Sequence, residues 1–507
     1  MIKQELPVEL ALINRVQQHP NRTAILAEDG RFSYQDLLRS SAQMAEQLLQ
    51  GAEDLKERRV AFLLKPGCTY VKVQWGIWRA GGIAVPLSPS HPPPEWEYVI
   101  QDTGADIVIA SFSYLKQLQP ITQKRAVRLI SDIFLTEQSK TSKLPQIHSQ
   151  RRAMILYTSG TTSRPKGVVY THRNIQAQIE ILVKAWQWQR QDHILHVLPL
   201  HHVHGIINVL SCALWSGAIC EMLPQFDAKV VWQKFVQSEL TLFMAVPTIY
   251  SKLINAWEAG STKQRQIWSK ACDKIRLMVS GSAALPVQVM EKWHSISGHS
   301  LLERYGMTEI GMALSNPLHG KRVPRYVGTP LPGIELRLVT DRGDVAAPGT
   351  AGEIQVKGTG VFLEYWRRGK ATQKAFQNGW FQTGDVAILE NGLYRILGRK
   401  SIDIIKTGGY KVSALEIEEV LRSHPDINEC AVVGLPDLEW GECVALALVP
   451  RFGQSISINT LRQWAKSRLA PYKVPTRFLE LDSLPRNLLG KVNKSEVVKQ
   501  FKPIKLP

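Results

Sequence analysis

The chain has 507 residues, of which 44% are hydrophobic and 21% charged, and its formal net charge is +18. This length exceeds a single hydrophobic core, so we expect at least two domains, and the composition is that of an ordinary globular protein. No run of 18 or more apolar residues occurs, which excludes a membrane span. The positive charge favours polyanionic ligands such as nucleotides, coenzyme A or nucleic acid, and a basic, well-solvated surface accounts for it equally well.

The N-terminal half alternates helical and strand-like segments. Residues 32–50 and 69–80 have helical periodicity, and the apolar runs at 58–64 and 81–88 are typical of buried strands. This alternation predicts an α/β architecture with largely parallel sheets. Further strand-like runs follow at 105–111, 193–200, 218–223, 240–247 and 275–283.

The pattern changes after about Gly328, where short strand-like segments with turn residues predict a β-subdomain. A smaller α+β unit begins near residue 411 and runs to the C-terminus. We place the domain boundary after residue 399. The predicted domains are a large N-terminal domain, 1–399, and a small C-terminal domain, 400–507.

Cysteine usage and the first residues bear on location. The six cysteines are scattered and form no CxxC pair, which suits a reducing compartment and gives no support for structural zinc. The N-terminus carries Glu5 and Glu9 and has no long apolar core, unlike a secretory signal or a transit peptide. We therefore expect a cytoplasmic protein. No RNA-recognition, homeodomain or zinc-finger pattern occurs, so nucleic acid is not an expected partner.

The segment YTSGTTSRPKGVVY, residues 157–170, gathers hydroxyl side chains, glycines and a lysine in one turn. Backbone N–H groups, hydroxyls and positive charge together suit a polyanion, so the segment predicts a phosphate-binding loop. It is not a Walker A loop, because Lys166 is followed by Gly167 and not by serine or threonine. The phosphate-binding residues expected from it are Thr158, Ser159, Gly160, Thr161, Thr162 and Lys166.

This loop resembles the phosphate loop of the adenylate-forming acyl-CoA synthetase superfamily, although Ser163 stands where the family usually has glycine. Further motifs follow in the family's order: LPLHHVHG (198–205), GSAALP (281–286), ERYGMTE (303–309), GWFQTGD (379–385), YRILGRK (394–400) and PRNLLGKVNK (485–494). The resemblance implies that the enzyme activates a carboxylate with Mg²⁺ and ATP as an acyl-adenylate. It then passes the acyl group to the thiol of coenzyme A.

The resemblance also assigns roles to residues. It implies that Lys491 meets the reacting carboxylate, that Thr308 donates to phosphate, that Glu309 holds Mg²⁺ and that His202 lines the acyl site. Tyr305 would stack on adenine, and its planar ring suits this contact. The remaining residues implied for the ATP or AMP site are Gly281, Ser282, Ala283, Glu303, Gly306, Asp385 and Arg399.

Arg304 is the unusual residue of the ERYGMTE motif, because many relatives that take neutral acids carry an uncharged residue there. An arginine fork matches a carboxylate, so we interpret Arg304 as a clamp for a second carboxylate on the substrate. Ser282, His202 and Met307 would complete that pocket. The alternative is a structural ion pair of Arg304 with Glu303 or Glu309. The motifs are similar to the malonyl-CoA synthetase family, which implies malonate as substrate and methylmalonate as a second one.

The resemblance implies that the C-terminal domain adopts two orientations about a hinge within 401–403. Lys491 would serve adenylation in one orientation. In the other, the coenzyme A side would be formed by Lys406, Gly408, Gly409 and Lys411.

Three alternatives stay open beside this prediction. They are a synthetase for another short or medium carboxylic acid, an adenylation protein that loads a carrier protein, and a nucleic-acid-binding protein that uses the basic surface. The sequence leaves the oligomeric state open between monomer and dimer.

Overall fold

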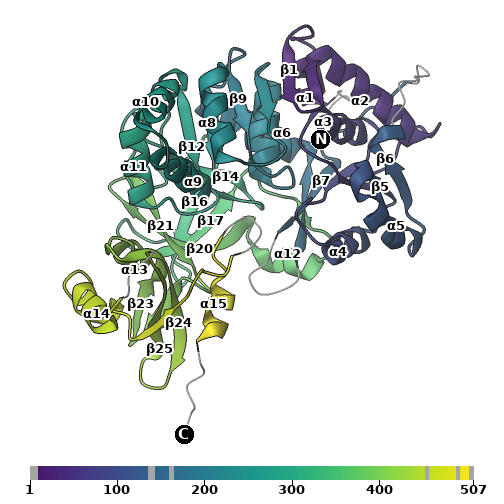
Figure 1. Cartoon of the computed structure of the whole chain (residues 1–507). Helices are drawn as coiled ribbons and strands as arrows, with labels where there is room; N and C mark the ends of the chain where they lie inside the picture. The colour runs from purple at the N-terminus through teal and green to yellow at the C-terminus, as the bar shows by residue number, and fades with distance from the viewer. Residues whose placement is uncertain (1–9, 135–142, 159–164, 452–455, 487–490, 502–507) are drawn as a thin grey trace.

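A computed structural model describes residues 10–134, 143–158, 165–451, 456–486 and 491–501. Figure 1 shows a large body built from the first four-fifths of the chain and a smaller green-to-yellow domain below it. This confirms the predicted α/β fold with a large N-terminal part and a small C-terminal α+β domain. Within the described ranges, no helix is both long and apolar enough to cross a membrane. All six cysteines are buried and free.

The first sheet contains three strands, β9, β12 and β13, that carry or directly precede predicted site motifs. Its inner neighbours from β13 to β1 are parallel, and the outer pairs are antiparallel. The strand order is β15 (Thr329–Pro330), β14 (Gly311–Ser315), β13 (Leu302–Met307), β12 (Leu277–Ser280), β11 (Leu242–Ala245), β9 (His193–His196), β10 (Ile219–Met222), β1 (Thr23–Ala27) and β2 (Gly30–Ser33). The helices beside it are α8 (Ala228–Gln237), α9 (Pro247–Glu258), α10 (Thr262–Ala271) and α11 (Val287–Ser297).

The second sheet confirms the strands expected near 58–64, 81–88 and 105–111. Their inner residues are buried on both faces, which parallel strands require when helices cover both sides. The strand order is β18 (Glu364–Tyr365), β8 (Lys166–Thr171), β7 (Arg152–Thr158), β4 (Ile83–Pro86), β3 (Arg59–Leu63), β5 (Ile107–Ala110) and β6 (Arg128–Ser131). The associated helices are α2 (Tyr34–Leu49), α3 (Cys68–Arg79), α4 (Pro93–Thr103) and α5 (Leu115–Gln123).

The other helices of the large part include one irregularity. The strand predicted at 193–200 ends at His196, and the chain then enters a π-helix, η3 (His204–Ser211). Because π-helical turns often mark functional sites, this segment draws attention to its first histidine. The remaining helices here are α1 (Ala11–Val16), α6 (His172–Ala185), α7 (Cys212–Trp215), α12 (Gly369–Ala375) and the 3₁₀ turns η1 (Phe112–Tyr114), η2 (Asp132–Phe134) and η4 (Cys272–Lys274).

The predicted β-subdomain is a small antiparallel sheet beside the C-terminal domain. Its order is β16 (Glu335–Val339), β17 (Gly352–Lys357), β20 (Trp380–Glu390) and β19 (Phe376–Gln377), with β21 (Leu393–Arg399) also paired to β20. Since β20 contains Asp385 and β21 ends at Arg399, their antiparallel register places these two residues opposite each other.

The C-terminal domain has a sheet of its own. Its order is β23 (Tyr410–Ser413), β22 (Ile404–Thr407), β25 (Gly441–Pro450) and β24 (Ile427–Asp437), with β26 (Arg477–Glu480) paired to β25. Its helices are α13 (Ala414–Leu421), α14 (Ile458–Lys466), α15 (Lys494–Gln500) and the 3₁₀ turn η5 (Pro471–Lys473). The boundary after residue 399 stays a prediction, and β22 begins five residues beyond it.

Candidate active site

The phosphate loop is the connection between β7 and β8. These antiparallel strands pair Thr158 with Lys166 at the loop's two ends, and the Thr158 hydroxyl lies 3.5 Å from the Lys166 carbonyl. The Lys166 ammonium lies 5.1 Å from the ring centre of Tyr365, within cation–π range. The structure therefore shows the two end residues of the loop, Thr158 and Lys166, side by side. The predicted residues Ser159, Gly160, Thr161 and Thr162 lie outside the described ranges, as does Ser163.

Helix α4 supports both ends of this loop, a feature that sequence reasoning missed. The Tyr98 hydroxyl donates to the Pro165 carbonyl at 2.7 Å, and the Tyr157 hydroxyl donates to Asp102 Oδ2 at 2.7 Å. Arg368 donates to the other oxygen of Asp102 at 2.5 Å. Tyr98 and Asp102 are one helical turn apart, so both hydrogen bonds come from one face of α4.

The predicted nucleotide residues from three strands meet at Asp385. The Tyr305 hydroxyl donates to Asp385 Oδ2 at 2.6 Å, and Arg399 Nε lies 3.1 Å from Oδ1. Burial raises the pKa of the Asp385 carboxyl, while the charges of Arg399 and Lys491 oppose that shift. Lys491 is thus close enough to act on Asp385 although it belongs to the C-terminal domain. The structure brings these four residues together.

Glu309 lies two residues beyond the end of β13, and its carboxylate is buried. Its Oε1 accepts a hydrogen bond from the Tyr365 hydroxyl at 2.9 Å, and burial raises the pKa of the carboxyl. A carboxylate oxygen is a hard ligand that suits Mg²⁺, and a cation would relieve the burial. The Glu309 carboxylate therefore fits Mg²⁺, which usually takes one or two protein carboxylates and completes its shell with water and phosphate oxygens. Within the described ranges no cluster of three or more metal-ligating residues occurs. Thr308 and Met307 precede Glu309 and are half-buried.

Arg304 is buried to 3% exposure and has no ion pair among the described residues. Its Nε and Nη2 atoms lack a hydrogen-bond partner there. Glu303 instead accepts from the Leu285 N–H at 3.0 Å, and Glu309 binds Tyr365, so neither acid neutralises the arginine. Burial lowers the pKa of the Arg304 guanidinium. The alternative of a structural ion pair with Glu303 or Glu309 is therefore not found.

The surroundings of Arg304 identify a histidine that sequence reasoning did not select. His204 Nδ1 lies 3.2 Å from the Ser282 hydroxyl, and its Nε2 has no partner in the described chain. Burial, and then the charge of Arg304, lower the pKa of His204 well below its usual value. The ring of His202, the predicted residue, lies 4.1 Å from that of His201.

Two glycines and one serine near Arg304 have constrained backbone positions. A Cβ atom on Gly281 would lie 2.3 Å from Arg304 Cζ, and one on Gly306 would lie 2.0 Å from the Gly311 carbonyl. Ser282 has φ of 68°, a left-handed conformation that costs a non-glycine residue about 1 kcal/mol or more. Strain held at a candidate site suggests a constraint on where the Ser282 hydroxyl lies. The exposed Ala283 follows it.

The predicted coenzyme A residues lie on the β22–β23 hairpin of the C-terminal domain. Lys411 forms an ion pair with Asp341 of the large part, and the Lys406 N–H donates to Glu442. The Gly408 N–H donates to the Trp440 carbonyl at 2.9 Å, and Gly409 has a φ of 80°. In this orientation Lys411 is therefore engaged across the domain boundary. Its role with coenzyme A stays a prediction.

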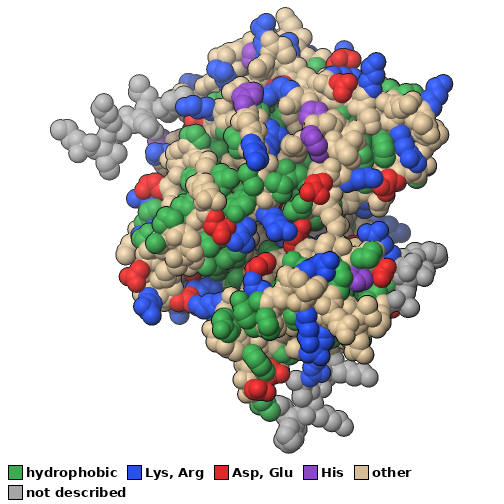
Figure 2. Space-filling view, turned by 90° about the vertical axis from the view of Figure 1, so that its left-hand side faces the viewer, with side chains coloured by type: hydrophobic (Ala, Val, Ile, Leu, Met, Phe, Trp, Pro, Cys, Tyr) green, Lys and Arg blue, Asp and Glu red, His purple; other side chains and the backbone are tan. Residues whose placement is uncertain are grey.

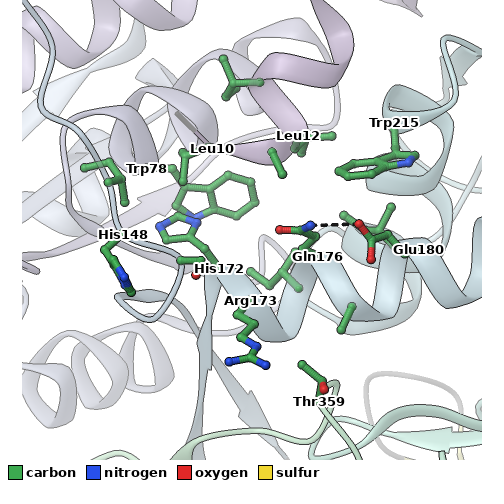
Figure 3. Close-up of a pocket in the computed structure, with 17 residues that line it drawn as sticks. Leu10, Leu12, Trp78, His148, His172, Arg173, Gln176, Glu180, Trp215 and Thr359 are labelled. Atoms are coloured by element: carbon green, nitrogen blue, oxygen red, sulfur yellow. Dashed lines mark hydrogen bonds between the residues drawn. The ribbon is translucent and has the colours of Figure 1, made fainter. Parts of the chain in front are cut away.

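A separate cavity of about 560 Å³ lies between α1, α3 and α6 (Figure 3). Trp78, His172 and Trp215 line it, and Gln176 donates to Glu180 at its side. None of the predicted site residues lines this cavity. It is therefore not the site that the motifs define.

A family described as AMP-binding enzyme matches residues 12–366, and its C-terminal domain matches residues 416–491. This chain belongs to the AMP-binding enzyme family.

Two relatives illustrate how specific the similarity is. The chain is 47% identical to the Mus musculus protein called malonate–CoA ligase ACSF3, mitochondrial, over 95% of this chain and 89% of that protein. It also resembles the crystal structure of ATP-bound MatB from Rhodopseudomonas palustris, with 30% identity, a TM-score of 0.89 and coverage of 97% and 99%. The apo structure of that MatB gives 0.80 at the same identity and coverage. The overall arrangement is thus more similar to the ATP-bound form.

Proposed function

We infer that this chain is an AMP-forming acid–thiol ligase that acts on malonate. It converts malonate, ATP and coenzyme A to malonyl-CoA, AMP and diphosphate. The single observation that carries the choice of acid is the unpaired guanidinium edge of Arg304. Nε and Nη2 are the two atoms with which arginine binds a carboxylate in bidentate fashion. An acid with a second carboxylate supplies the missing anion, and a monocarboxylate does not.

The reaction proceeds in two steps. In the first, an oxygen of one malonate carboxylate attacks the α-phosphorus, and the bond to the β-phosphate oxygen breaks with release of diphosphate. In the second, the coenzyme A sulfur attacks the acyl carbon, the carbon–oxygen bond to AMP breaks, and the thiol proton is lost. Both steps gain from positioning and from cations near the developing negative charge.

The chain's own residues hold the reactants in this proposal. Arg304, with Ser282 and His204, binds the distal carboxylate, while Lys491 lies between the reacting carboxylate and the α-phosphate. Asp385 and Arg399 orient the ribose. Mg²⁺, bound by Glu309, would neutralise phosphate charge. His204 is neutral at physiological pH because its pKa is lowered, so it donates a hydrogen bond without adding a second charge to the pocket.

The residues beside Arg304 are consistent with a short acid. The Ser282 hydroxyl and the His204 ring are 3.2 Å apart, and Met307 is half-buried at the end of β13, the strand that carries Arg304. We extend the proposal to methylmalonate, whose extra methyl group leaves both carboxylates free. Coenzyme A is proposed as the acceptor. A carrier-protein thiol is the second acceptor to test.

Location and further partners remain predictions. The expected cytoplasmic location contrasts with the name of the mouse relative, which places that protein in the mitochondrion. On the face shown in Figure 2, lysine and arginine side chains alternate with acidic ones. A nucleic-acid surface usually gathers positive charge on one face, so this view does not favour that alternative.

The test is coenzyme A-dependent AMP release with Mg-ATP, comparing malonate, methylmalonate, acetate, succinate and octanoate. Malonate should give the highest kcat/KM. Arg304→Ala should lose malonate activity selectively. A lead for octanoate or acetate that is insensitive to Arg304→Ala would leave an acyl-CoA synthetase but refute malonate as its substrate.

A further inference from the structure

The C-terminal domain contains a buried lysine, Lys494, that the reaction scheme above does not use. Its side chain is 10% exposed and lies between two carboxylates. Lys494 Nζ is 2.7 Å from Asp403 Oδ1 and 2.6 Å from Glu418 Oε1. Burial opposes the ammonium charge, but the two acids outweigh it and raise the pKa of Lys494. This cation is fully paired.

Glu418 anchors the lysine to the core of the C-terminal domain. Its side chain is 3% exposed, and its Oε1 also accepts from the Val432 N–H at 2.9 Å. Its Oε2 lies 2.8 Å from Arg422. Since α13 carries Glu418 and β24 carries Val432, the lysine is fixed to two elements that move with this domain.

Asp403 joins the lysine to the linker between the domains. Its Oδ2 accepts from the Arg399 N–H at 2.9 Å, while its Oδ1 holds Lys494. One carboxylate therefore binds residues on both sides of the segment 400–402. Rotation of the C-terminal domain about that segment has to break the hydrogen bond to Arg399, whereas the pair with Lys494 can persist.

The connection continues into the nucleotide site. The Arg399 side chain lies 3.1 Å from Asp385, which in turn accepts from Tyr305. Lys494 is also only three residues beyond Lys491 and begins α15. The Asn493 N–H between them donates to the Pro485 carbonyl at 2.8 Å. The anchored lysine is thus close in sequence to the predicted catalytic lysine and is linked through Asp403 to the ribose-binding pair.

We propose that Lys494 is a positioning residue for adenylation: by binding Asp403 and Glu418 together, it sets Lys491 and Arg399 in register at the nucleotide site. It touches neither substrate nor reacting atoms. Its effect is specific to the domain orientation in which Asp403 accepts from the Arg399 N–H. Thioester formation, which the other orientation serves, does not need that hydrogen bond.

The experiment separates the two half-reactions in the full-length chain. Adenylation is followed by malonate-dependent exchange of pyrophosphate into ATP, and thioester formation by conversion of supplied malonyl-adenylate with coenzyme A. Lys494→Met should slow exchange about 100-fold, as expected for a small misplacement of a reacting group, and slow thioester formation less than threefold. Lys494→Arg should recover most of the exchange.

Lys499→Met is the matched control, because Lys499 lies on the same helix and forms only an exposed pair with Glu496. It should leave both half-reactions unchanged. If Lys494→Met does not fold, Asp403→Asn provides the same test, since it removes the ion pair but keeps an acceptor for Arg399. Equal loss of both half-reactions, or no loss in either, would overturn the proposal.

The inference rests on the proposed adenylation chemistry. If the wild type fails to exchange pyrophosphate with malonate but does so with another acid, the choice of malonate fails. The role of Lys494 is then decided with that other acid.

Discussion

Two buried cations in this molecule differ in one respect. Arg304, in the large domain, has no anion among the described residues, whereas Lys494, in the C-terminal domain, has two. Burying an unpaired charge destabilises a fold, so it persists where a ligand supplies the counter-charge. A fully paired buried charge instead fixes one part of the structure to another. On the two proposals above, the difference separates a residue that recognises substrate from a residue that holds the domains in register.

The largest expected effect concerns stability at the paired cation. Lys494→Met leaves the carboxylates of Asp403 and Glu418 without their cation and should cost about 3–5 kcal/mol of unfolding free energy. Arg304→Met removes an unpaired buried charge and should be neutral or stabilising. Urea denaturation of both variants measures this. Equal destabilisation would show that Arg304 has a structural partner and would remove the contrast.

Catalysis should respond in the opposite way at the unpaired cation. Without the Arg304 guanidinium, the distal carboxylate of malonate is buried without a partner. Arg304→Met should therefore lower kcat/KM for malonate by about two to three orders of magnitude. The value for butyrate should change less than tenfold. Steady-state AMP release with both acids decides between the outcomes, and a parallel fall for both would indicate a general disturbance of the site.

Glu303, next to Arg304, is a buried acid that should make the stability of the large domain depend on pH. Burial raises the pKa of its carboxyl from 4.5 to about 8, so the folded protein keeps a proton that the unfolded chain releases. Stability should therefore fall as pH rises from about 4.5 to 8, by up to about 1.4 kcal/mol per pH unit, and level off above. Glu303→Gln should lose this slope. Melting temperatures at pH 6, 7, 8 and 9 measure the difference, and parallel curves would contradict the assignment.

The smallest expected effect is at a neutral contact. Tyr98→Phe removes the hydrogen bond to the Pro165 carbonyl, worth about 1 kcal/mol, so the KM for ATP should rise about fivefold. The KM for malonate should stay constant. Tyr114→Phe is a suitable control, because that ring packs against Trp96 at one end of α5. An equal rise in both Michaelis constants would show that α4 supports the whole site and not the phosphate loop.

Much of the fold was predictable from the sequence, and so was the set of residues that converge at the candidate site, because both depend on local patterns. Apolar runs predicted β3, β4 and β5, and the ordered motifs predicted that Tyr305, Asp385 and Arg399 belong to one nucleotide site. These residues do converge in the structure.

Pairings across long separations were not predictable. Asp403 and Lys494 are 91 residues apart, and Tyr98 and Pro165 are 67 apart. Neither pair is marked by a local sequence pattern. The sequence selected His202 for the acyl site, whereas the ring within hydrogen-bond distance of Ser282 is that of His204, the first residue of a π-helix that no local pattern predicted.

In the proposed acyl site, the residues at positions 281 and 304 share one volume, so both positions should influence substrate choice. A side chain there would overlap Arg304 Cζ, since a Cβ atom would lie 2.3 Å away. Any residue larger than glycine at 281 therefore requires the Arg304 guanidinium to shift, and shortening residue 304 frees that volume. Directed evolution toward uncharged or bulkier acids should vary both positions in one library.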